Sequence, residues 1–324
     1  MMKAIRFSQT GAPDVLAFKD IVLPATQPNE VRVRHTAIGV NFIDTYHRSG
    51  LYPVTLPSGV GLEAAGVVEV AGENVTHLKT GDRVAYCSGP IGAYAEANNV
   101  PADRVVKLPD AISDETAAAS LLKGMTVQYL LKRTFAVQRG QTILFHAAAG
   151  GVGLIAGQWA KHLGANVIGT VGSDKKIKLA KQNGYHHVLN TRNEDWVTRV
   201  REITNGEGVP VVYDSIGKDT FEASLNCLSV RGLMVSFGNA SGPVPPFEPG
   251  ILNAKGSLYF TRPSLMAYTR TAQELQETAD DLFSVIASGA VKITINQRFK
   301  LEEAQAAHEA LHSRKTTGAT ILKP

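Results

Sequence analysis

The chain of 324 residues is longer than a single hydrophobic core usually supports, and it suits two domains of ordinary size. Its hydrophobic content of 44% and charged content of 19% are typical of globular proteins and exclude a disordered or fibrous chain. A net charge of +4, without a long block of Lys or Arg, argues against a nucleic-acid partner.

Three features bear on the cellular compartment. No apolar stretch reaches the roughly 18 residues that a membrane-spanning helix needs. The first residues, MMKAIRFSQTG, lack the apolar run of a secretion signal. Cys87 and Cys227 lie far apart in the sequence and suggest no disulfide framework. We therefore expect a cytoplasmic protein without a membrane partner, in which both cysteines are buried small residues.

Short strands separated by turn residues make up about the first 110 residues. The expected strands are Met2–Phe7, Glu30–Gly39, Ala64–Gly72 and Asp82–Tyr86. Gly, Pro and Asn lie between them, as in the loop Ser49–Gly61. The apolar period then becomes helical, with Ser113 in the N-cap position of a helix that starts DETAAASLLKG.

A regular alternation of strands and helices follows, which is typical of βαβ units and a parallel sheet. The expected strands are Thr142–His146, Asn166–Val171, His187–Asn190, Val209–Ser215 and Gly232–Phe237. The expected helices are Gly153–Leu163, Asp174–Gln182, Glu194–Thr204 and Thr220–Leu228.

The C-terminal part changes character after the segment SGPVPPFEPG and one more apolar strand, Gly256–Phe260. A helix at Thr271–Ile286, a strand KITINQRF, a helix EEAQAAHEALH and a strand ATILK follow. We expect this tail to return to the first domain. The predicted fold is α/β, with a mostly β substrate domain (residues 1–122 and 263–324) around a doubly wound parallel-sheet domain (residues 123–262).

The strongest motif is the run Ala148-Ala149-Gly150-Gly151-Val152-Gly153, which follows an expected strand and opens an expected helix. Small residues there let the backbone turn tightly and approach a pyrophosphate, whose charge the helix N-terminal amides stabilise. Ala148 occupies the first glycine position of the dinucleotide pattern. The alternative is an ordinary glycine-rich helix start, but the βαβ context favours a dinucleotide site.

The choice of dinucleotide follows from the end of the second strand, Asn166–Val171. NAD sites carry an acidic residue there that binds the ribose 2′-hydroxyl, whereas this chain has Gly172. Ser173 and Lys176 then offer donors for a 2′-phosphate at a helix start. NADPH is therefore the expected cofactor. The alternative, that Lys176 belongs to a solvated helix face, gains some support from the neighbouring Asp174.

With this motif placed, nearly the whole chain resembles the zinc-less quinone oxidoreductases, the zeta-crystallin-like branch of the medium-chain dehydrogenase/reductase superfamily. The stretches that carry the resemblance are GVNFIDTYHRSGLYP, LPSGVGLEAAGVV, GDRVAY, LLKGMT, FHAAAGGVG, VVYDSIG, SFGNASG and SRKTTGATILKP. The resemblance implies a GroES-like substrate domain and a Rossmann domain. It also implies a homodimer that pairs the last strand of the Rossmann domain, here Gly256–Phe260.

Zinc-dependent relatives carry a Cys in the loop that matches residues 39–44 and a His where this chain has Leu62. The cysteine cluster of a structural zinc lobe is reduced to Cys87. Zinc needs three or four close N/S ligands, so no metal is expected. His308 and His312 share a helix face, and without a third ligand we expect them to face solvent.

A site without zinc favours an acceptor whose reduced anion is weakly basic. An alkoxide is comparable to hydroxide, with a conjugate acid of about 15.7, whereas a phenolate-like hydroquinone anion has one of about 10. The difference is worth about 8 kcal/mol of anion stability. A quinone therefore accepts hydride with only hydrogen bonds to help it, and the enolate of an enone or enoyl thioester is similarly delocalised.

The resemblance also assigns roles to particular residues. Asn41 and Tyr46 are expected beside the nicotinamide, where each polarises the acceptor oxygen and the proton comes from solvent. A packed aromatic is the alternative for Tyr46, and Asp44 is expected to be a structural partner of their loop. The remaining cofactor contacts that the resemblance implies are Thr126, Gly217, Phe237, Gly238, Phe260 and Arg314. Thr191 departs from a Tyr that some relatives carry near the adenosine.

The sequence thus predicts an NADPH-dependent quinone reductase. An alkenal, enone or enoyl-thioester reductase is the alternative enzyme. A non-catalytic NADPH-binding protein with a structural or RNA-binding role is the alternative from another class.

Overall fold

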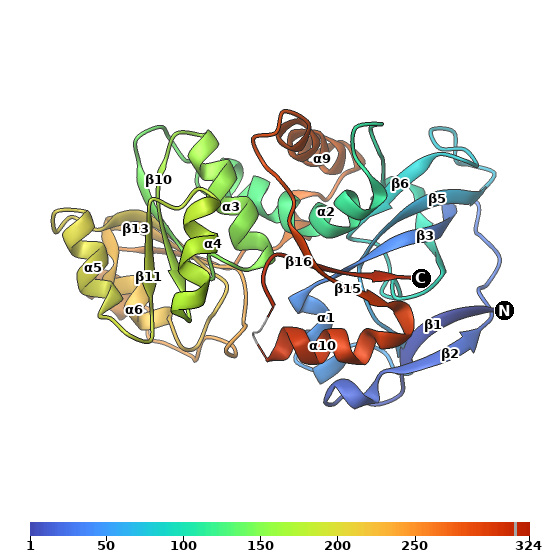
Figure 1. Ribbon diagram of the computed structural model, residues 1–324, viewed down its shortest axis with the longest axis horizontal. Helices are drawn as coiled ribbons and strands as arrows, with labels where there is room; N and C mark the ends of the chain where they lie inside the picture. Colours follow the sequence, from blue (N-terminus) through green and yellow to red (C-terminus); the bar gives the residue numbers. More distant parts are fainter. Residues whose placement is uncertain (314–315) are drawn as a thin grey trace. The chain divides into compact units, whose positions relative to one another are not determined.

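The computed structural model describes residues 1–313 and 316–324, and the chain forms two compact units (Figure 1). Unit 1 comprises Met1–Met125, Thr269–Ala287 and Ile293–Pro324, and unit 2 comprises Thr126–Tyr268 and Ser288–Lys292. Each unit has its own hydrophobic core. Among the described residues, no helix is both long and apolar enough to cross a membrane.

The boundaries differ slightly from those the sequence predicts, which fall after residues 122 and 262. Helix α2 (Asp114–Tyr129) runs through the first boundary, so the chain leaves unit 1 only after Met125. The second boundary follows Tyr268, because the short helix α8 (Leu265–Tyr268) belongs to unit 2.

Unit 1 contains two mostly antiparallel sheets, with strand orders β2-β1-β4 and β15-β16-β3-β5-β6-β8, and β7 also pairs with β3. The strands are β1 (Met2–Phe7), β2 (Ala17–Ile21), β3 (Glu30–Val40), β4 (Ser58–Gly59), β5 (Glu63–Ala71), β6 (Arg83–Tyr86), β7 (Ala97–Pro101), β8 (Val105–Lys107), β15 (Ile295–Lys300) and β16 (Ala319–Lys323). Ile321 of β16 lies opposite Gly39 of β3, so the C-terminal tail pairs with the N-terminal sheet.

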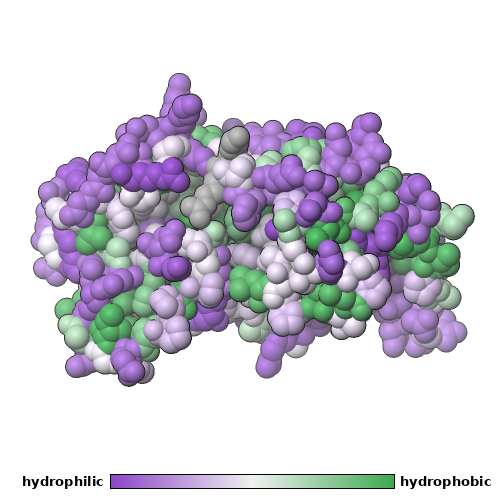
Figure 2. All heavy atoms as spheres, turned by 90° about the horizontal axis from the view of Figure 1, so that it is seen from below, coloured by the Kyte–Doolittle hydropathy of each residue, from purple (hydrophilic) through white to green (hydrophobic). Residues whose placement is uncertain are grey.

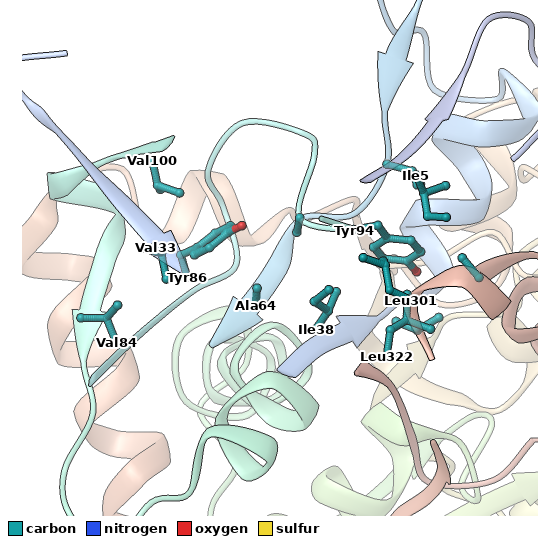
Figure 3. Close-up of a cluster of buried hydrophobic side chains, with 14 of the residues drawn as sticks. Ile5, Val33, Ile38, Ala64, Val84, Tyr86, Tyr94, Val100, Leu301 and Leu322 are labelled. Atoms are coloured by element: carbon teal, nitrogen blue, oxygen red, sulfur yellow. The ribbon is translucent and has the colours of Figure 1, made fainter. Parts of the chain in front are cut away.

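The core of unit 1 follows from the period of its strands. Val31 and Val33 of β3 are fully buried, while the intervening Arg32 is only partly buried. Figure 3 shows Val33 in a cluster with side chains from several strands, and Leu322 joins it from the C-terminal tail. Alternation along a strand places every second side chain on the buried face.

In the described residues of unit 1, four helices and three short 3-10 turns accompany the strands. They are α1 (Phe42–Ser49), the first part of α2, α9 (Ala272–Ala287), α10 (Ala304–His312), η1 (Pro13–Val15), η2 (Ala102–Arg104) and η5 (Leu301–Glu303). The Oγ of Ser113 accepts the backbone N–H of Thr116 at 3.1 Å, which confirms the predicted N-cap of α2. The segment expected as a loop after Gly39 instead enters helix α1.

Unit 2 is a six-stranded sheet in which all neighbouring strands are parallel, in the order β11-β10-β9-β12-β13-β14. Counted from β9, this is the dinucleotide-binding order 3-2-1-4-5-6, which confirms the predicted doubly wound fold. The strands are β9 (Thr142–Phe145), β10 (Asn166–Val171), β11 (His187–Asn190), β12 (Val209–Asp214), β13 (Leu228–Ser236) and β14 (Tyr259–Thr261).

The helices of unit 2 are α3 (Gly151–His162), α4 (Ile177–Gln182), α5 (Trp196–Ile203), α6 (Phe221–Asn226), α7 (Gly250–Ala254) and α8, with a π-helical turn η3 (Leu130–Thr134) and a 3-10 turn η4 (Asp174–Lys176). The helix expected over Asp174–Gln182 therefore begins as a 3-10 turn.

The face shown in Figure 2 carries small groups of hydrophobic residues between polar ones, an ordinary protein surface.

Candidate functional site

The carboxyl ends of the parallel strands in unit 2 lie at one edge of the sheet, which we call the carboxyl edge. The predicted nucleotide-binding segments follow these ends directly. Gly150 comes after β9, Gly172 after β10, Thr191 after β11, Gly217 after β12 and Phe237 after β13. Ligands of open parallel sheets bind outside this edge. The fold thus gathers segments that are far apart in the sequence.

The glycine turn after β9 has the geometry of a phosphate-binding turn. Ala147 adopts a positive φ of 54°, and the N–H of Gly150 donates to the carbonyl of Ala147 at 2.9 Å. Gly150 is the N-cap of α3, so the amides of Gly151 and Val152 lie in its first turn. A Cβ at Gly153 would overlap the Ala147 carbonyl. The turn therefore requires small residues. It also presents the backbone N–H groups of the first turn of α3, which suit a dinucleotide pyrophosphate.

A buried polar network supports this turn. His146 makes hydrogen bonds to Thr170 Oγ1 at 2.7 Å and to Ser224 Oγ at 2.9 Å, and burial lowers the pKa of its imidazole. Ser224 Oγ in turn donates to Asp214 Oδ2 at 3.1 Å. Asp214 Oδ1 accepts the backbone N–H of Gly217 at 3.1 Å. His146 therefore has a structural role, and Asp214 orients the turn after β12.

The sequence did not single out Asp214. Its available signal is a carboxylate at the end of an otherwise apolar strand, VPVVYD.

The segment after β10 offers cationic and hydroxyl groups. Gly172 is exposed, and a Cβ built on it would lie 3.9 Å from Nε of Arg192. Ser173 is the N-cap of the 3-10 turn η4 and Lys176 is its last residue, and both are partly buried. Arg192 was missed by the sequence analysis, although it directly follows the Thr191 that was considered there. The guanidinium suits a phosphate, since its planar fork donates several hydrogen bonds.

Asp174 is the one carboxylate in the SDKK segment, and its oxygens are already engaged. Oδ1 accepts from Asn190 Nδ2 at 2.7 Å, and Oδ2 accepts from Asn193 Nδ2 at 3.1 Å. These bonds tie the end of β11 to the turn after β10. Asn190 thus has a structural partner of its own.

The remaining nucleotide candidates are held by close packing. Gly217 has a φ of 90°, and a Cβ there would lie 2.5 Å from the carbonyl oxygen of Gly242. A Cβ at Gly238 would lie 2.6 Å from the carbonyl oxygen of Ser215. The Phe237 ring centroid lies 5.6 Å from that of Phe145.

Phe260, Thr126 and Arg314 are the last three cofactor candidates that the resemblance implied. Phe260 packs its ring against Phe221 and Phe247, at centroid distances of 5.9 and 5.3 Å, so the structure places it in an aromatic cluster of unit 2. Thr126 lies on α2 and is 8% exposed. Arg314 lies outside the described residues.

In unit 1, Asn41 is the N-cap of helix α1. Its backbone N–H donates to Asp44 Oδ2 at 2.8 Å, and the same oxygen accepts the Tyr94 hydroxyl at 3.0 Å. Burial raises the pKa of the Asp44 carboxyl to about 7, although both hydrogen bonds oppose the shift. Asp44 is therefore a structural partner of this segment, as expected.

The side chain of Asn41 is held by a second carboxylate. Its Nδ2 donates to Glu63 Oε2 at 2.7 Å, and Lys123 Nζ lies 3.4 Å from the same oxygen. Glu63 and Lys123 are both buried. The stretches LPSGVGLEAAGVV and LLKGMT contain them, but the sequence analysis gave neither a role, since they are 60 positions apart and meet only through packing.

Tyr46, the second polarising candidate, lies on α1 and is 8% exposed. Its ring meets the edge of Tyr52 at a centroid distance of 5.1 Å, and the N–H of Tyr52 donates to the Tyr46 carbonyl at 3.1 Å. Tyr52 is a further aromatic hydroxyl of this segment that the sequence analysis did not consider. The two tyrosines pack against each other, so the position of the Tyr46 hydroxyl is restrained.

The prediction that His308 faces solvent is wrong. His308 is fully buried on α10, and its Nε2 lies 3.2 Å from the Tyr94 hydroxyl, while His312 is exposed. Burial lowers the pKa of His308 to about 3. The described part of the chain contains no group of three His, Cys, Asp or Glu side chains placed to hold a metal ion. Leu62, Cys87 and Cys227 are buried, the last two as free thiols.

Comparisons with known proteins agree with this architecture. The family model for the alcohol dehydrogenase GroES-like domain matches residues 27–110, and the model for the zinc-binding dehydrogenase matches residues 151–284. A quinone oxidoreductase of Pseudomonas aeruginosa is 55% identical over 100% of both chains. A 2-haloacrylate reductase of a Burkholderia species is 43% identical, covering 100% of this chain and 99% of that protein.

Among solved structures, the Escherichia coli quinone oxidoreductase complexed with NADPH has a TM-score of 0.98. It is 54% identical in sequence and covers 99% of this chain and 100% of its own.

Proposed function

We propose that this chain, which belongs to the zeta-crystallin-like quinone oxidoreductases of the medium-chain dehydrogenase/reductase superfamily, reduces a quinone or a similar conjugated carbonyl with NADPH. The observation that carries the proposal is the presence of a phosphate-binding turn after β9 together with the buried polar residues Asn41 and Tyr46, where zinc-dependent relatives hold a metal. These are the two parts that a metal-independent hydride transfer needs.

The carboxyl edge fits NADPH. Ala149, Gly150, Gly151 and Val152 supply small residues and helix amides for the pyrophosphate. Ser173, Lys176 and Arg192 supply donors for the 2′-phosphate, and Gly172 leaves room for it. Bound NADPH supplies the hydride. The further residues proposed to contact it, by family resemblance, are Asn41, Thr126, Gly217, Phe237, Gly238, Phe260 and Arg314.

In unit 1, Asn41 and Tyr46 are proposed to donate hydrogen bonds to the carbonyl oxygen of the acceptor. A hydroquinone anion is weakly basic, since its conjugate acid is near 10. Two donors in a buried position are therefore enough to stabilise it, and the proton comes from solvent. We propose that no metal ion takes part, because Leu62 stands where zinc-dependent relatives have a His ligand.

A conjugated alkene is the second candidate acceptor. The observation that favours it is the 43% identity to a protein named 2-haloacrylate reductase. An enolate formed by conjugate addition of hydride is delocalised over carbon and oxygen, so the same two donors suit it.

We also propose a homodimer in the cytoplasm. Strand β14 is an edge strand of the six-stranded sheet, and its Tyr259 is 61% exposed. Exposed edge strands tend to be paired or covered, and pairing two copies of β14 would extend the sheet across a two-fold axis. The free, buried thiols of Cys87 and Cys227 suit a reducing compartment.

A panel of NADPH-consumption assays tests the proposed function. Soluble quinones, alkenals, enones and enoyl thioesters are compared at equal concentrations, with NADH in place of NADPH as a parallel series. We expect the highest kcat/KM for quinones with NADPH. Faster turnover of an alkenal or enoyl thioester would favour the second candidate. NADPH binding without turnover of any acceptor would contradict the enzyme assignment.

A further inference from the structure

The buried carboxylate of Glu63 joins three segments of unit 1. Glu63 begins β5 and is fully buried. Its Oε1 accepts the backbone N–H of Leu122 on α2 at 2.7 Å, and its Oε2 accepts Nδ2 of Asn41 at 2.7 Å. A Cβ at Gly39, on the adjacent strand, would overlap this carboxylate. The absence of a side chain at Gly39 therefore leaves room for the Glu63 carboxylate, which accepts the hydrogen bond from Asn41.

Lys123 supplies the counter-charge. Its Nζ lies 3.4 Å from Glu63 Oε2, and its side chain is only 7% exposed. A buried ion pair is weak evidence for stability, because desolvation of two charges offsets much of their attraction. Its location beside Asn41 suggests a task other than stabilising the fold.

A carboxylate accepts hydrogen bonds and donates none, which determines how Asn41 is oriented. Only the NH₂ end of the amide can face Glu63, since rotation by half a turn would place Oδ1 against the carboxylate. The backbone N–H of Asn41 is fixed as well, because it donates to Asp44 at 2.8 Å. Asn41 is thus held at two atoms by the acidic side chains of Glu63 and Asp44.

We propose that Glu63, with its charge balanced by Lys123, is a positioning residue that fixes the amide orientation of Asn41. In this orientation the second N–H of the Asn41 amide is the group offered to the oxygen of the acceptor. The inference rests on the proposed function for the identity of the acceptor, but the orientation of the amide is a property of unit 1 alone.

Two single variants and their combination separate positioning from stability. Glu63→Gln offers one acceptor oxygen where the carboxylate offers two, so Leu122 and Asn41 compete for it. Glu63→Gln and Lys123→Met each leave one buried charge unpaired, and we expect each to lower the melting temperature. The double variant removes both charges, so its melting temperature should return toward the wild-type value.

The turnover number should behave differently from the melting temperature. With a soluble quinone we expect kcat to fall about tenfold in Glu63→Gln and to remain low in the double variant, because Asn41 is no longer oriented. Glu63→Asp, which retains the carboxylate, should recover part of the loss. A double variant with wild-type kcat would overturn the proposal, since the pair would then be purely structural.

Glu115→Gln is the matched control. Glu115 lies on the same helix α2 and pairs with Arg298 at 3.0 Å and Lys323 at 3.0 Å, neither of which is a partner of Asn41 or Glu63 in the hydrogen bonds described above. The Glu115→Gln variant loses a carboxylate and two ion pairs, and we expect its kcat to remain unchanged. An equal loss in Glu115→Gln would show that any perturbation of α2 lowers turnover, which would also overturn the proposal.

The side-chain amide resonances of Asn41 give a readout that needs no substrate. In the wild-type protein one Nδ2 proton should be shifted downfield by its bond to Glu63, and Glu63→Gln/Lys123→Met should reduce the shift, because the neutral amide oxygen is a weaker acceptor for which Leu122 competes. If the wild-type protein reduces no acceptor, the proposed function fails while this experiment still decides the orientation of Asn41. A shift that is the same in the wild-type and double-variant spectra would contradict the positioning role of Glu63.

Discussion

The candidate sites of the two units are made of different kinds of groups, backbone in one and side chains in the other. Unit 2 uses the backbone: a positive φ at Ala147, the first turn of α3 and glycines packed against carbonyls. All of these follow the ends of parallel strands. Unit 1 uses buried side chains, and Asn41, Glu63 and Lys123 come from three separate segments.

This difference predicts how each site responds to change. A backbone site should be sensitive to added volume, because its atoms have little freedom to move. A site of buried polar side chains should be sensitive to charge and pH, because desolvated groups shift their pKa values. Substitutions chosen for volume in unit 2 and for charge in unit 1 test the contrast.

The largest effect is expected from the pH dependence of Asp44. Its carboxyl ionises near 3.8 in the unfolded chain but near 7 in the folded protein. The folded state therefore holds a proton that the unfolded state has lost, and stability falls as pH rises between these values. The loss is about 1.4 kcal/mol per pH unit, or roughly 4 kcal/mol over the whole interval.

Asp44→Asn should remove this contribution. Its free energy of unfolding, measured by denaturant titration at pH 5, 6 and 7, should rise relative to the wild-type value as pH increases. If the free energy of unfolding changed with pH in the same way in both proteins, the result would contradict a raised pKa of the Asp44 carboxyl.

In unit 2, Gly153→Ala is expected to weaken NADPH binding by about a hundredfold, because overpacking displaces the start of α3 and its amides. Gly250→Ala is the matched control. A Cβ at Gly250 meets open space, so binding should be unchanged there. Fluorescence titration with NADPH measures both. Equal affinity in Gly153→Ala and wild-type protein would mean that the close packing at this turn does not shape the site.

A smaller effect is expected for the contribution of the 2′-phosphate to cofactor affinity. NADPH should bind at least tenfold more tightly than NADH, a difference of about 1.4 kcal/mol. Lys176→Ala should reduce this preference by weakening NADPH alone, with the exposed Lys175→Ala as the control. Equal dissociation constants for the two cofactors in the wild-type protein would contradict the NADPH assignment.

The smallest of these effects is expected from Tyr46→Phe. A quinone product needs modest stabilisation, so kcat should fall about tenfold while NADPH affinity stays close to the wild-type value. Steady-state kinetics with a soluble quinone measures this. A loss of a thousandfold or more with intact cofactor binding would make Tyr46 an obligatory acid and would exclude a proton supplied by solvent.

Sequence reasoning found most of unit 2, because its fold repeats a strand and a helix over short distances. The strands Asn166–Val171 and His187–Asn190 have the predicted bounds, and the glycine turn lies where a local motif placed it. What it missed were side chains whose roles depend on long-range packing. Arg192 reaches Gly172 only because β11 lies next to β10.

Unit 1 was less predictable for the same physical reason. Asn41, Asp44 and Tyr46 belong to one short segment that family resemblance marked. Glu63 contacts Asn41, and Lys123 pairs with Glu63, only after β5 and α2 have packed beside Asn41, and no local period reveals that. His308 was expected to face solvent because its helix was considered alone, without Tyr94.

The most direct test of the account is turnover of the wild-type protein after dialysis against a strong chelator. NADPH oxidation by a soluble quinone is followed before and after dialysis, together with the metal content of the protein. We predict that the dialysed protein retains its full rate and its melting temperature. Stoichiometric zinc in the purified protein, with activity lost on its removal and restored on its return, would contradict the central claim that hydrogen bonds from Asn41 and Tyr46 replace a metal.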